Sequence, residues 1–194
     1  MLVSGIVSRP KYEPFALDPS GRSHLIVADH PAPPGDFGPT PASNAPIEIW
    51  CVCTNPRTTA EASQNGRAVS RSFRSTAHLL DQLDKRLARE LVGLRIYAVG
   101  IESFVWDVAR LARKFGMEKG EYRLTHKGSE RRRVYCIHCR AYTEDVTTNI
   151  VSCSGCGASL LVRDHYSRRL AAFMGVQVDA EVPGDVPAIE EAFP

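Results

Sequence analysis

The chain has 194 residues and a nearly balanced charge, with 24 Lys and Arg against 22 Asp and Glu. This length allows one or two domains, and the formal net charge of +2 does not indicate a protein that binds polyanions over its whole surface. No apolar run approaches the roughly 20 residues that a membrane span needs. The N-terminus also lacks the apolar stretch of a secretory signal. We therefore expect a cytoplasmic protein with no membrane partner.

Short apolar runs rich in Ile and Val, bounded by turn-forming residues, predict the strands of a first domain. These runs cover residues 24–29, 47–53, 94–100 and 121–125. The polar residues 58–74 interrupt this pattern and are expected to form a loop or a weak helix. Because the other predicted strands alternate with helices, we predict a mostly parallel sheet with helices packed on it. This α/β domain would cover residues 1–130.

Two amphipathic segments predict the helices that cover the sheet. Residues 76–92 place their leucines on one face, Leu91 among them, and Gly93 follows as a stop. Ser103 is expected to cap a second helix, which ends at Gly116.

Four cysteines in two Cys-x-x-Cys pairs form the most specific motif of the sequence. Cys136 and Cys139 make the first pair, and Cys153 and Cys156 make the second. In a chain without a secretion signal, this spacing indicates a metal site and not a disulfide framework. Two tight turns can direct the four thiolates to one tetrahedral zinc ion. We expect a small metal ribbon over residues 131–162.

The rest of the ribbon is predicted from its local pattern. Residues 127–133 are expected to be a basic linker between the two domains. Residues 141–146 and 149–152 suit a β-hairpin, and residues 159–162 can add a third strand.

The metal ribbon allows three functions. Four thiolates leave no open coordination position, so zinc would stabilise a module that is too small for a core of its own. Iron in the same cage would make a rubredoxin-like electron carrier, because geometry alone does not separate the two metals. We expect zinc, with iron as the alternative. The arginines at 131–133 leave a zinc-ribbon nucleic-acid binder as a third possibility, which the acidic C-terminal tail weakens.

No other motif of the chain indicates a reaction site. Cys51 and Cys53 fall on one face of a predicted strand, and we expect two small buried residues, not a second metal or redox pair. Asp29, His30 and Pro31 follow the first strand, where a dinucleotide site needs glycines. Asp29 would also repel a phosphate group. We therefore expect no nucleotide cofactor and no catalytic residue in the α/β domain.

Several motifs together resemble the small-subunit, DmmA-like family of bacterial dimethylamine monooxygenases. In the second half they are residues 133–139 (RVYCIHC), 153–157 (CSGCG), 165–169 (HYSRR) and 171–181 (AAFMGVQVDAE). In the first half they are residues 12–14 (YEP), 17–19 (LDP), 21–22 (GR) and 24–28 (HLIVA). The resemblance covers nearly the whole chain and is most specific over residues 134–181.

The resemblance implies a subunit of a multi-subunit enzyme that uses NADPH and O₂ to convert dimethylamine to methylamine and formaldehyde. Its partners would be a reductase subunit that carries FMN and a 2Fe–2S cluster and an oxygenase subunit that carries haem. The family's cofactor residues lie in those subunits, so none for flavin or haem is assigned here. The first domain is also similar to the nicotinamide domain of ferredoxin reductases, without its glycine-rich loop. This degenerate domain implies an accessory subunit that assembles the other two.

Residues 163–194 are expected to form a partner-docking arm that ends in an acidic tail. Beyond Gly175 the acidic tail contains Pro183 and Pro187, which suits an extended strap on a basic surface. A basic and aromatic cluster, with apolar residues at helical spacing behind it, suits a short amphipathic turn in a partner's groove. The predicted partner-binding residues are Arg163, His165, Tyr166, Arg168, Arg169, Phe173 and Met174. The alternative is a tail that folds back on the ribbon.

Overall fold

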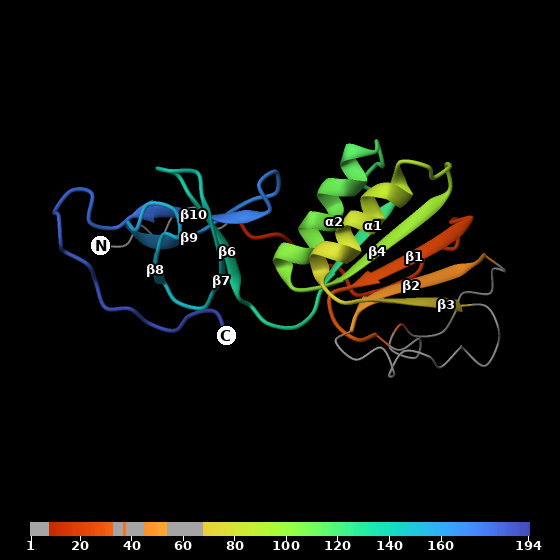
Figure 1. Cartoon of the computed structure of the whole chain (residues 1–194), viewed down its shortest axis with the longest axis horizontal. Coiled ribbons are helices and arrows are strands. Elements are labelled where there is room, and N and C mark those ends of the chain that lie inside the picture. The colour runs from red at the N-terminus through yellow and green to blue at the C-terminus, as the bar shows by residue number, and fades with distance from the viewer. Residues whose placement is uncertain (1–7, 33–36, 38–44, 54–67) are drawn as a thin grey trace. The chain divides into compact units, whose positions relative to one another are not determined.

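The computed structural model describes residues 8–32, 37, 45–53 and 68–194. The chain forms two compact units (Figure 1). Tyr12–Lys127 form the first, which we call the α/β unit. Gly128–Pro194, together with the N-terminal segment that ends at Lys11, form the second, which we call the cysteine unit.

The α/β unit contains a parallel five-stranded sheet with the order β3-β2-β1-β4-β5. Its strands are β1 (Ser23–Ala28), β2 (Ile47–Val52), β3 (Ala68–Phe73), β4 (Leu94–Gly100) and β5 (Tyr122–His126). The predicted parallel sheet with helices is confirmed. β3 was not predicted as a strand, because its sequence is polar and has no apolar run. It lies at the edge of the sheet, where pairing with β2 makes it extended. Residues 58–67 of the predicted loop or weak helix lie outside the described residues.

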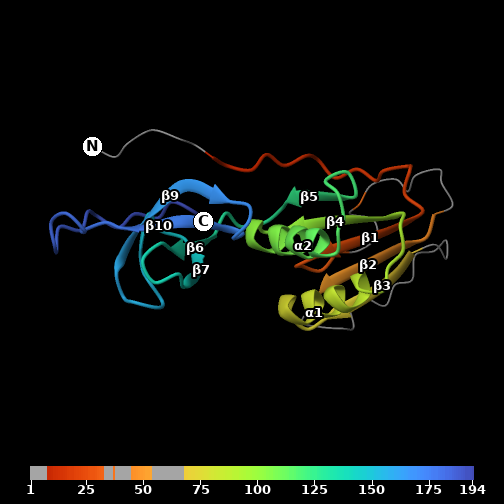
Figure 2. The same cartoon turned by 90° about the horizontal axis from the view of Figure 1, so that it is seen from above.

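Two helices, α1 (Thr76–Leu87) and α2 (Glu102–Lys114), pack on one face of this sheet and against each other (Figures 1 and 2). α1 buries leucines at a spacing of four, and its N-cap Ser75 accepts a hydrogen bond from the backbone N–H of His78. It ends five residues before the predicted end at Val92, in a tightened turn where the Glu90 N–H donates to the Leu87 carbonyl. Leu91 is therefore 82% exposed, although the leucine pattern predicts it to be buried.

The second helix begins at Glu102, and Ile101 is its N-cap residue. The predicted cap, Ser103, lies inside the first turn, so that prediction is wrong. The other face of the sheet has no helix among the described residues. There Ile26, Ile49 and Tyr97 form an apolar cluster with neighbouring strand residues, and Phe15, which precedes β1 in the same unit, packs against it.

The cysteine unit contains a mixed five-stranded sheet with the order β7-β6-β10-β9-β8. Its strands are β6 (Arg132–Cys136), β7 (Tyr142–Val146), β8 (Ile150–Ser152), β9 (Ser159–Ser167) and β10 (Ala172–Gln177). β10 is the central strand, parallel to β6 and antiparallel to β9. β7 and β8 exist as predicted but do not form a hairpin, since β7 pairs with β6 and β8 pairs with β9.

Two further predictions for this unit are wrong. The predicted linker extends to Arg133, but β6 already begins at Arg132. The predicted helical turn around Phe173 is strand β10. Gly175 explains why β10 fits beside β6, because a Cβ at this position would lie only 2.6 Å from Cγ1 of Val134. The predicted third strand, residues 159–162, is the first part of β9, which continues to Ser167.

The N-terminal segment pairs with the C-terminal half of β9. The Ser8 N–H donates to the Asp164 carbonyl at 3.1 Å, and the Tyr166 N–H donates to the Ser8 carbonyl at 3.2 Å. The Arg9 guanidinium and the Asp164 carboxylate form an ion pair at 2.8 Å. The cysteine unit therefore combines residues from both sides of the α/β unit in the sequence.

Helices α1 and α2, of 12 and 13 residues, are both too short to span a lipid bilayer.

Candidate functional site

The four predicted ligand cysteines come together in the cysteine unit. Their Sγ atoms all lie within 4.8 Å of one another. The Sγ atoms of Cys136 and Cys156 are 4.0 Å apart, and those of Cys139 and Cys153 are 3.5 Å apart. In a tetrahedral zinc site with Zn–S bonds of about 2.3 Å, the sulfurs are roughly 3.8 Å apart. The cluster therefore fits a tetrahedral metal ion.

Two similar turns hold the four sulfurs in place. In the first, the Arg140 N–H donates to the Cys136 carbonyl at 2.9 Å, and in the second the Gly157 N–H donates to the Cys153 carbonyl at 3.0 Å. Both donor residues have a positive φ, 66° at Arg140 and 74° at Gly157. This conformation costs a non-glycine residue free energy, so the first turn is the more strained one.

Close packing beside the sulfurs requires a glycine at position 155. A Cβ at this position would lie 2.6 Å from Cβ of Ala141 and 3.1 Å from Sγ of Cys139. The Gly155 N–H also donates to Sγ of Cys153 at 3.4 Å. The second turn therefore directs a backbone amide to one of the sulfurs.

The electrostatics of the cluster favour a bound cation. Burial raises the pKa of the Cys153 thiol, but backbone N–H groups of Cys156 and Gly155 and the neighbouring thiols stabilise its thiolate and lower the pKa to about 6. At Cys139 an N–H from Ala141 lowers the pKa, whereas burial and the three other sulfurs raise it to about 12. Four sulfurs this close resist ionising together, and a divalent cation removes that conflict.

Four thiolates around one ion leave no open coordination position. Such a site stabilises the surrounding fold or, with a redox-active metal, carries an electron. It does not activate a water molecule or bind a substrate. Among the described residues this is the one group of His, Cys, Asp and Glu that could hold a metal ion.

Sequence reasoning missed a buried arginine on β6, the strand that ends at Cys136. The side chain of Arg132 is only 4% exposed, and its guanidinium lies 3.9 Å from the ring centre of Phe173 and 3.6 Å from that of Phe193. It also forms an ion pair with Asp164 at 2.7 Å. Arg132, Val134 and Cys136 alternate on the buried face of β6, and this alternation is the signal that could have identified the strand.

At the carboxyl edge of the parallel sheet, the carboxylate of Asp29 is bound by other groups of the same chain. Asp29 follows β1, and its Oδ2 accepts a hydrogen bond from the Ile101 N–H at 2.9 Å, at the start of α2. A Cβ on the neighbouring Gly100 would lie only 2.4 Å from the Asp29 carboxyl group. His30 completes the contact with Nδ1 at 2.8 Å from Asp29 Oδ1. The N-terminus of α2, where an α/β fold holds a phosphate, is thus occupied by a side chain of the protein.

The two cysteines of β2 are buried, as predicted. Cys51 is 1% exposed and Cys53 is 4% exposed. Burial raises the pKa of the Cys51 thiol, so it is a poor nucleophile and a poor metal ligand.

Comparison with known proteins identifies the family. Residues 4–121 match the N-terminal domain, and residues 133–176 the C-terminal domain, of the family described as dimethylamine monooxygenase subunit DmmA-like. The chain belongs to the DmmA-like family. This confirms the resemblance stated from the sequence.

One relative is described as the delta subunit of a heme-dependent oxidative N-demethylase from Ectopseudomonas mendocina (strain ymp). It is 37% identical over 111 residues, which are 57% of this chain and 63% of the relative. The match therefore spans less than two thirds of that relative's length. No solved structure matches the chain.

The seven predicted partner-binding residues of this DmmA-like chain do not share one surface. Arg163, His165, Arg168 and Arg169 are exposed, and Met174 is half-buried. Tyr166 and Phe173 are 5% and 3% exposed, because their rings pack edge to face inside the cysteine unit at 4.9 Å. The idea that Phe173 inserts into a partner's groove is therefore wrong.

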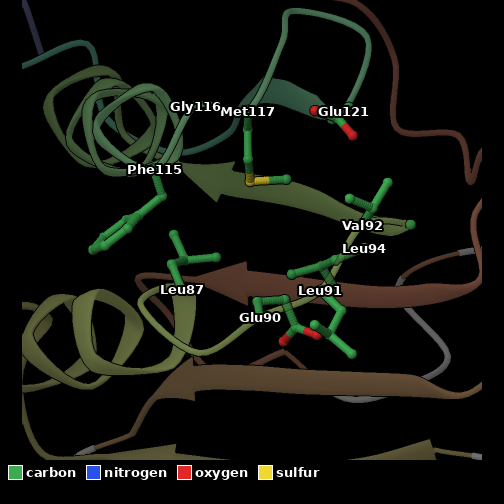
Figure 3. Close-up of a pocket in the computed structure, with 10 residues that line it drawn as sticks. Leu87, Glu90, Leu91, Val92, Leu94, Phe115, Gly116, Met117 and Glu121 are labelled. Carbon is green, nitrogen blue, oxygen red and sulfur yellow. The ribbon is translucent and has the colours of Figure 1, made fainter.

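A small hollow lies in the α/β unit, between the carboxyl ends of its two helices (Figure 3). Its volume is about 150 Å³, and the side chains of Leu87, Phe115 and Met117 are among those that line it. Sites for cofactors or drug-sized ligands usually have 300–1,000 Å³. The hollow also lies where β4 begins, at the edge of the sheet opposite to Asp29. Its size and its place both disfavour a nucleotide site.

Proposed function

We propose that this chain is an accessory subunit of an NADPH- and O₂-dependent dimethylamine monooxygenase and has no reaction site of its own. Membership in the DmmA-like family and the N-demethylase relative support a role in such an enzyme. The observation that carries the accessory role is the Asp29 carboxylate at the N-terminus of α2.

That carboxylate separates this domain from a working reductase domain. The N-terminus of a helix attracts an anion through its free N–H groups and its dipole. Here Asp29 already accepts the N–H of Ile101, and its negative charge would repel a dinucleotide's pyrophosphate. The cysteine cluster offers no substrate position either. The contribution that remains is to position other subunits, where small displacements of reacting groups cost large factors in rate.

The partners in this proposal are a flavin and 2Fe–2S reductase subunit and a haem-containing oxygenase subunit. The haem subunit is supported by the description of the relative. The reductase subunit is proposed as a partner because the sequence resembles the family. In this complex the four cysteines would hold zinc, which would keep the cysteine unit folded without taking part in electron transfer.

Two measurements test the proposal. Calorimetry of the isolated chain with NADPH is expected to show no binding, and the isolated chain is expected not to oxidise dimethylamine. Co-expression with the reductase and haem subunits is expected to give one complex whose amine oxidation falls when this chain is omitted. Micromolar NADPH binding to this chain alone, or full activity of the complex without it, would contradict the proposal.

A second candidate function is electron transfer through iron in the same site. Cys156 is exposed and Cys139 is half-buried, so an electron could reach the metal from a partner without crossing the core. A ferric site of four thiolates is red, whereas zinc is colourless. A red protein with one iron per chain, purified without added metal, would replace the zinc proposal.

A further inference from the structure

The segment 178–189, which we call the strap, carries exposed apolar side chains. It follows β10 and precedes the last five residues of the chain. Val182 is 59% exposed, Val186 38% and Ile189 64%. The strap thus exposes three large apolar side chains to water within residues 182–189, and exposed apolar surface that is contiguous often marks an interaction site.

Both ends of the strap are fixed to the cysteine unit. At its start, the Val178 N–H donates to the Ser159 carbonyl at 2.9 Å. Just after its end, the Glu190 N–H donates to Oδ1 of Asn149 at 2.8 Å, and the Phe193 N–H donates to the Thr147 carbonyl at 2.8 Å. Phe193 is buried against the Arg132 guanidinium. The strap is therefore a closed loop with a defined position and not a loose tail.

The strap also has a defined internal shape. The Gly184 N–H donates to Oδ2 of Asp179 at 3.1 Å, and the Asp185 N–H donates to the Val182 carbonyl at 3.1 Å. Gly184 adopts a positive φ of 87°, which a turn requires and glycine accepts at little cost. A loop that is ordered in advance loses less conformational entropy when it binds a partner.

Negative charge surrounds the apolar side chains. The acidic residues are Asp179, Glu181, Asp185, Glu190 and Glu191, and the chain contains no Lys or Arg after Arg169. In the part of the chain that the structure describes, none of these five carboxylates forms an ion pair. The β9–β10 turn, which carries the exposed Arg168 and Arg169, precedes β10, whereas the strap follows the other end of that strand. The charge of the strap is thus available to a partner.

We propose that the strap docks onto a protein surface where Lys and Arg side chains surround an apolar groove. This inference rests on the proposed function, in which that surface belongs to the reductase or the haem subunit. The apolar side chains would fill the groove, and the carboxylates would select a basic surface and increase the rate of encounter. The docking element is then the acidic end of the predicted arm, and not its basic and aromatic cluster.

The test uses the full chain, purified with its zinc, and the co-expressed reductase and haem subunits as the binding partner. One variant reverses two charges (Glu181→Lys with Asp185→Lys), and a second removes the apolar contacts (Val182→Ser with Ile189→Ser). We expect each to weaken binding at least tenfold by calorimetry, with unchanged circular dichroism and metal content. Binding of the unchanged chain is expected to weaken as salt rises from 50 to 500 mM, because salt screens exposed charges.

Matched variants in the α/β unit provide the control. Glu13→Lys with Glu118→Lys reverses two exposed carboxylates, and Leu91→Ser with Val92→Ser removes two exposed apolar side chains. Both are expected to bind like the unchanged chain. If the strap variants bind normally, or if the controls lose as much affinity, the docking inference is wrong and the proposed function stands. If the unchanged chain binds neither subunit, the proposed function fails and the inference fails with it.

Discussion

Arg132 shows how a single charged residue can organise a small unit. Its guanidinium lies between the rings of Phe173 and Phe193 and is paired with Asp164. The ring of Phe193 belongs to the C-terminal end of the chain, and Asp164 also binds Arg9 from the N-terminal segment. One buried cation therefore joins the central strand of the sheet to both of these segments.

Arg132→Ala is expected to destabilise the cysteine unit by about 2–4 kcal/mol, because it removes a buried cation from two rings and a carboxylate. The value is below that of a fully buried pair, since Asp164 remains partly solvated and keeps Arg9. Urea unfolding followed by near-ultraviolet circular dichroism measures the change. Arg131→Ala, at an exposed pair with Asp145, is the control and is expected to cost less than 1 kcal/mol. If both substitutions lowered the free energy of unfolding equally, the burial of Arg132 would not be the cause of its contribution.

One zinc ion per chain is expected at Cys136, Cys139, Cys153 and Cys156. Cys153→Ser removes one of the four thiolates, so it is expected to abolish stoichiometric zinc binding and to unfold the cysteine unit. The helical signal of the α/β unit is expected to persist. Elemental analysis and far-ultraviolet circular dichroism measure the two effects, and Cys51→Ser is a control that should retain zinc. Stoichiometric iron, or no metal, in the unchanged chain would contradict the assignment.

His24 makes the α/β unit sensitive to acid. The residue is 1% exposed, and its Nδ1 lies 3.1 Å from the hydroxyl of Tyr97, which accepts the Asp18 N–H at 2.8 Å. Burial lowers the pKa of His24; the negative charge of Asp18 raises it and the positive charge of Arg95 lowers it further. The unfolded chain therefore takes up the proton first as pH falls below about 6.5.

The free energy of unfolding of the α/β unit is accordingly expected to be fully present above pH 6.5 and to fall as the pH drops from 6.5 towards the lowered pKa. Urea unfolding of the helical signal at pH 7.5 and pH 5.5 measures this change. His24→Gln should reduce the difference between the two pH values, whereas His165→Gln, at an exposed site, should leave it unchanged. A difference that His24→Gln does not alter would contradict this assignment.

Helix α2 illustrates how an element obtains its cap from elsewhere in the fold. Its N-cap residue is Ile101, whose side chain cannot accept a hydrogen bond. The carboxylate of Asp29, at the end of the neighbouring strand β1, accepts the Ile101 N–H instead and lies near the positive end of the helix dipole.

Asp29→Ala is expected to lower the stability of the α/β unit by about 0.5–2 kcal/mol, the usual cost of losing a helix cap. It is not expected to create an NADPH site, because no glycine-rich loop follows β1. Thermal unfolding and calorimetry with NADPH measure the two effects. Asp29→Asn keeps the acceptor oxygen and should lose less stability. NADPH binding by Asp29→Ala would show that the carboxylate alone excludes the cofactor.

The elements that the sequence predicts well are those whose pattern is local. The Ile- and Val-rich runs of β1, β2 and β4 and the leucine spacing of α1 depend on neighbours in the sequence, as do the two Cys-x-x-Cys turns. β3 and β10 become strands only through pairing with β2 and β6. The contact of Asp29 with Ile101 requires β1 and β4 to be adjacent. The burial of Arg132 depends on Phe193, which is distant in sequence.

At the scale of the whole molecule, the region predicted as a docking arm is mostly part of the fold. β10 is the central strand of the cysteine unit, and β9 is complete only at Ser167. The alternative of a tail that folds back is correct for the end of the chain, where residues 190–193 bind Asn149 and Thr147.

Truncation after Val162 is therefore expected to unfold the cysteine unit and release its metal, since it removes β10 and half of β9. The α/β unit is expected to keep its helical signal. Zinc content and circular dichroism measure both effects. The exchange of residues 180–188 for a flexible linker of Gly and Ser is the control and should retain zinc. A truncated chain that still binds zinc stoichiometrically would contradict the role of β10.

The pairing of the N-terminal segment with β9 sets an order for folding during synthesis. Arg9 and Asp164 are 155 positions apart, and ribosomes add about 5–20 residues per second. At these rates the first described residues of the chain are made roughly eight to thirty seconds before their partner strand, while the α/β unit emerges and can fold. The cysteine unit is completed last, so a metal ion at its four cysteines would enter a protein whose larger part already has its structure.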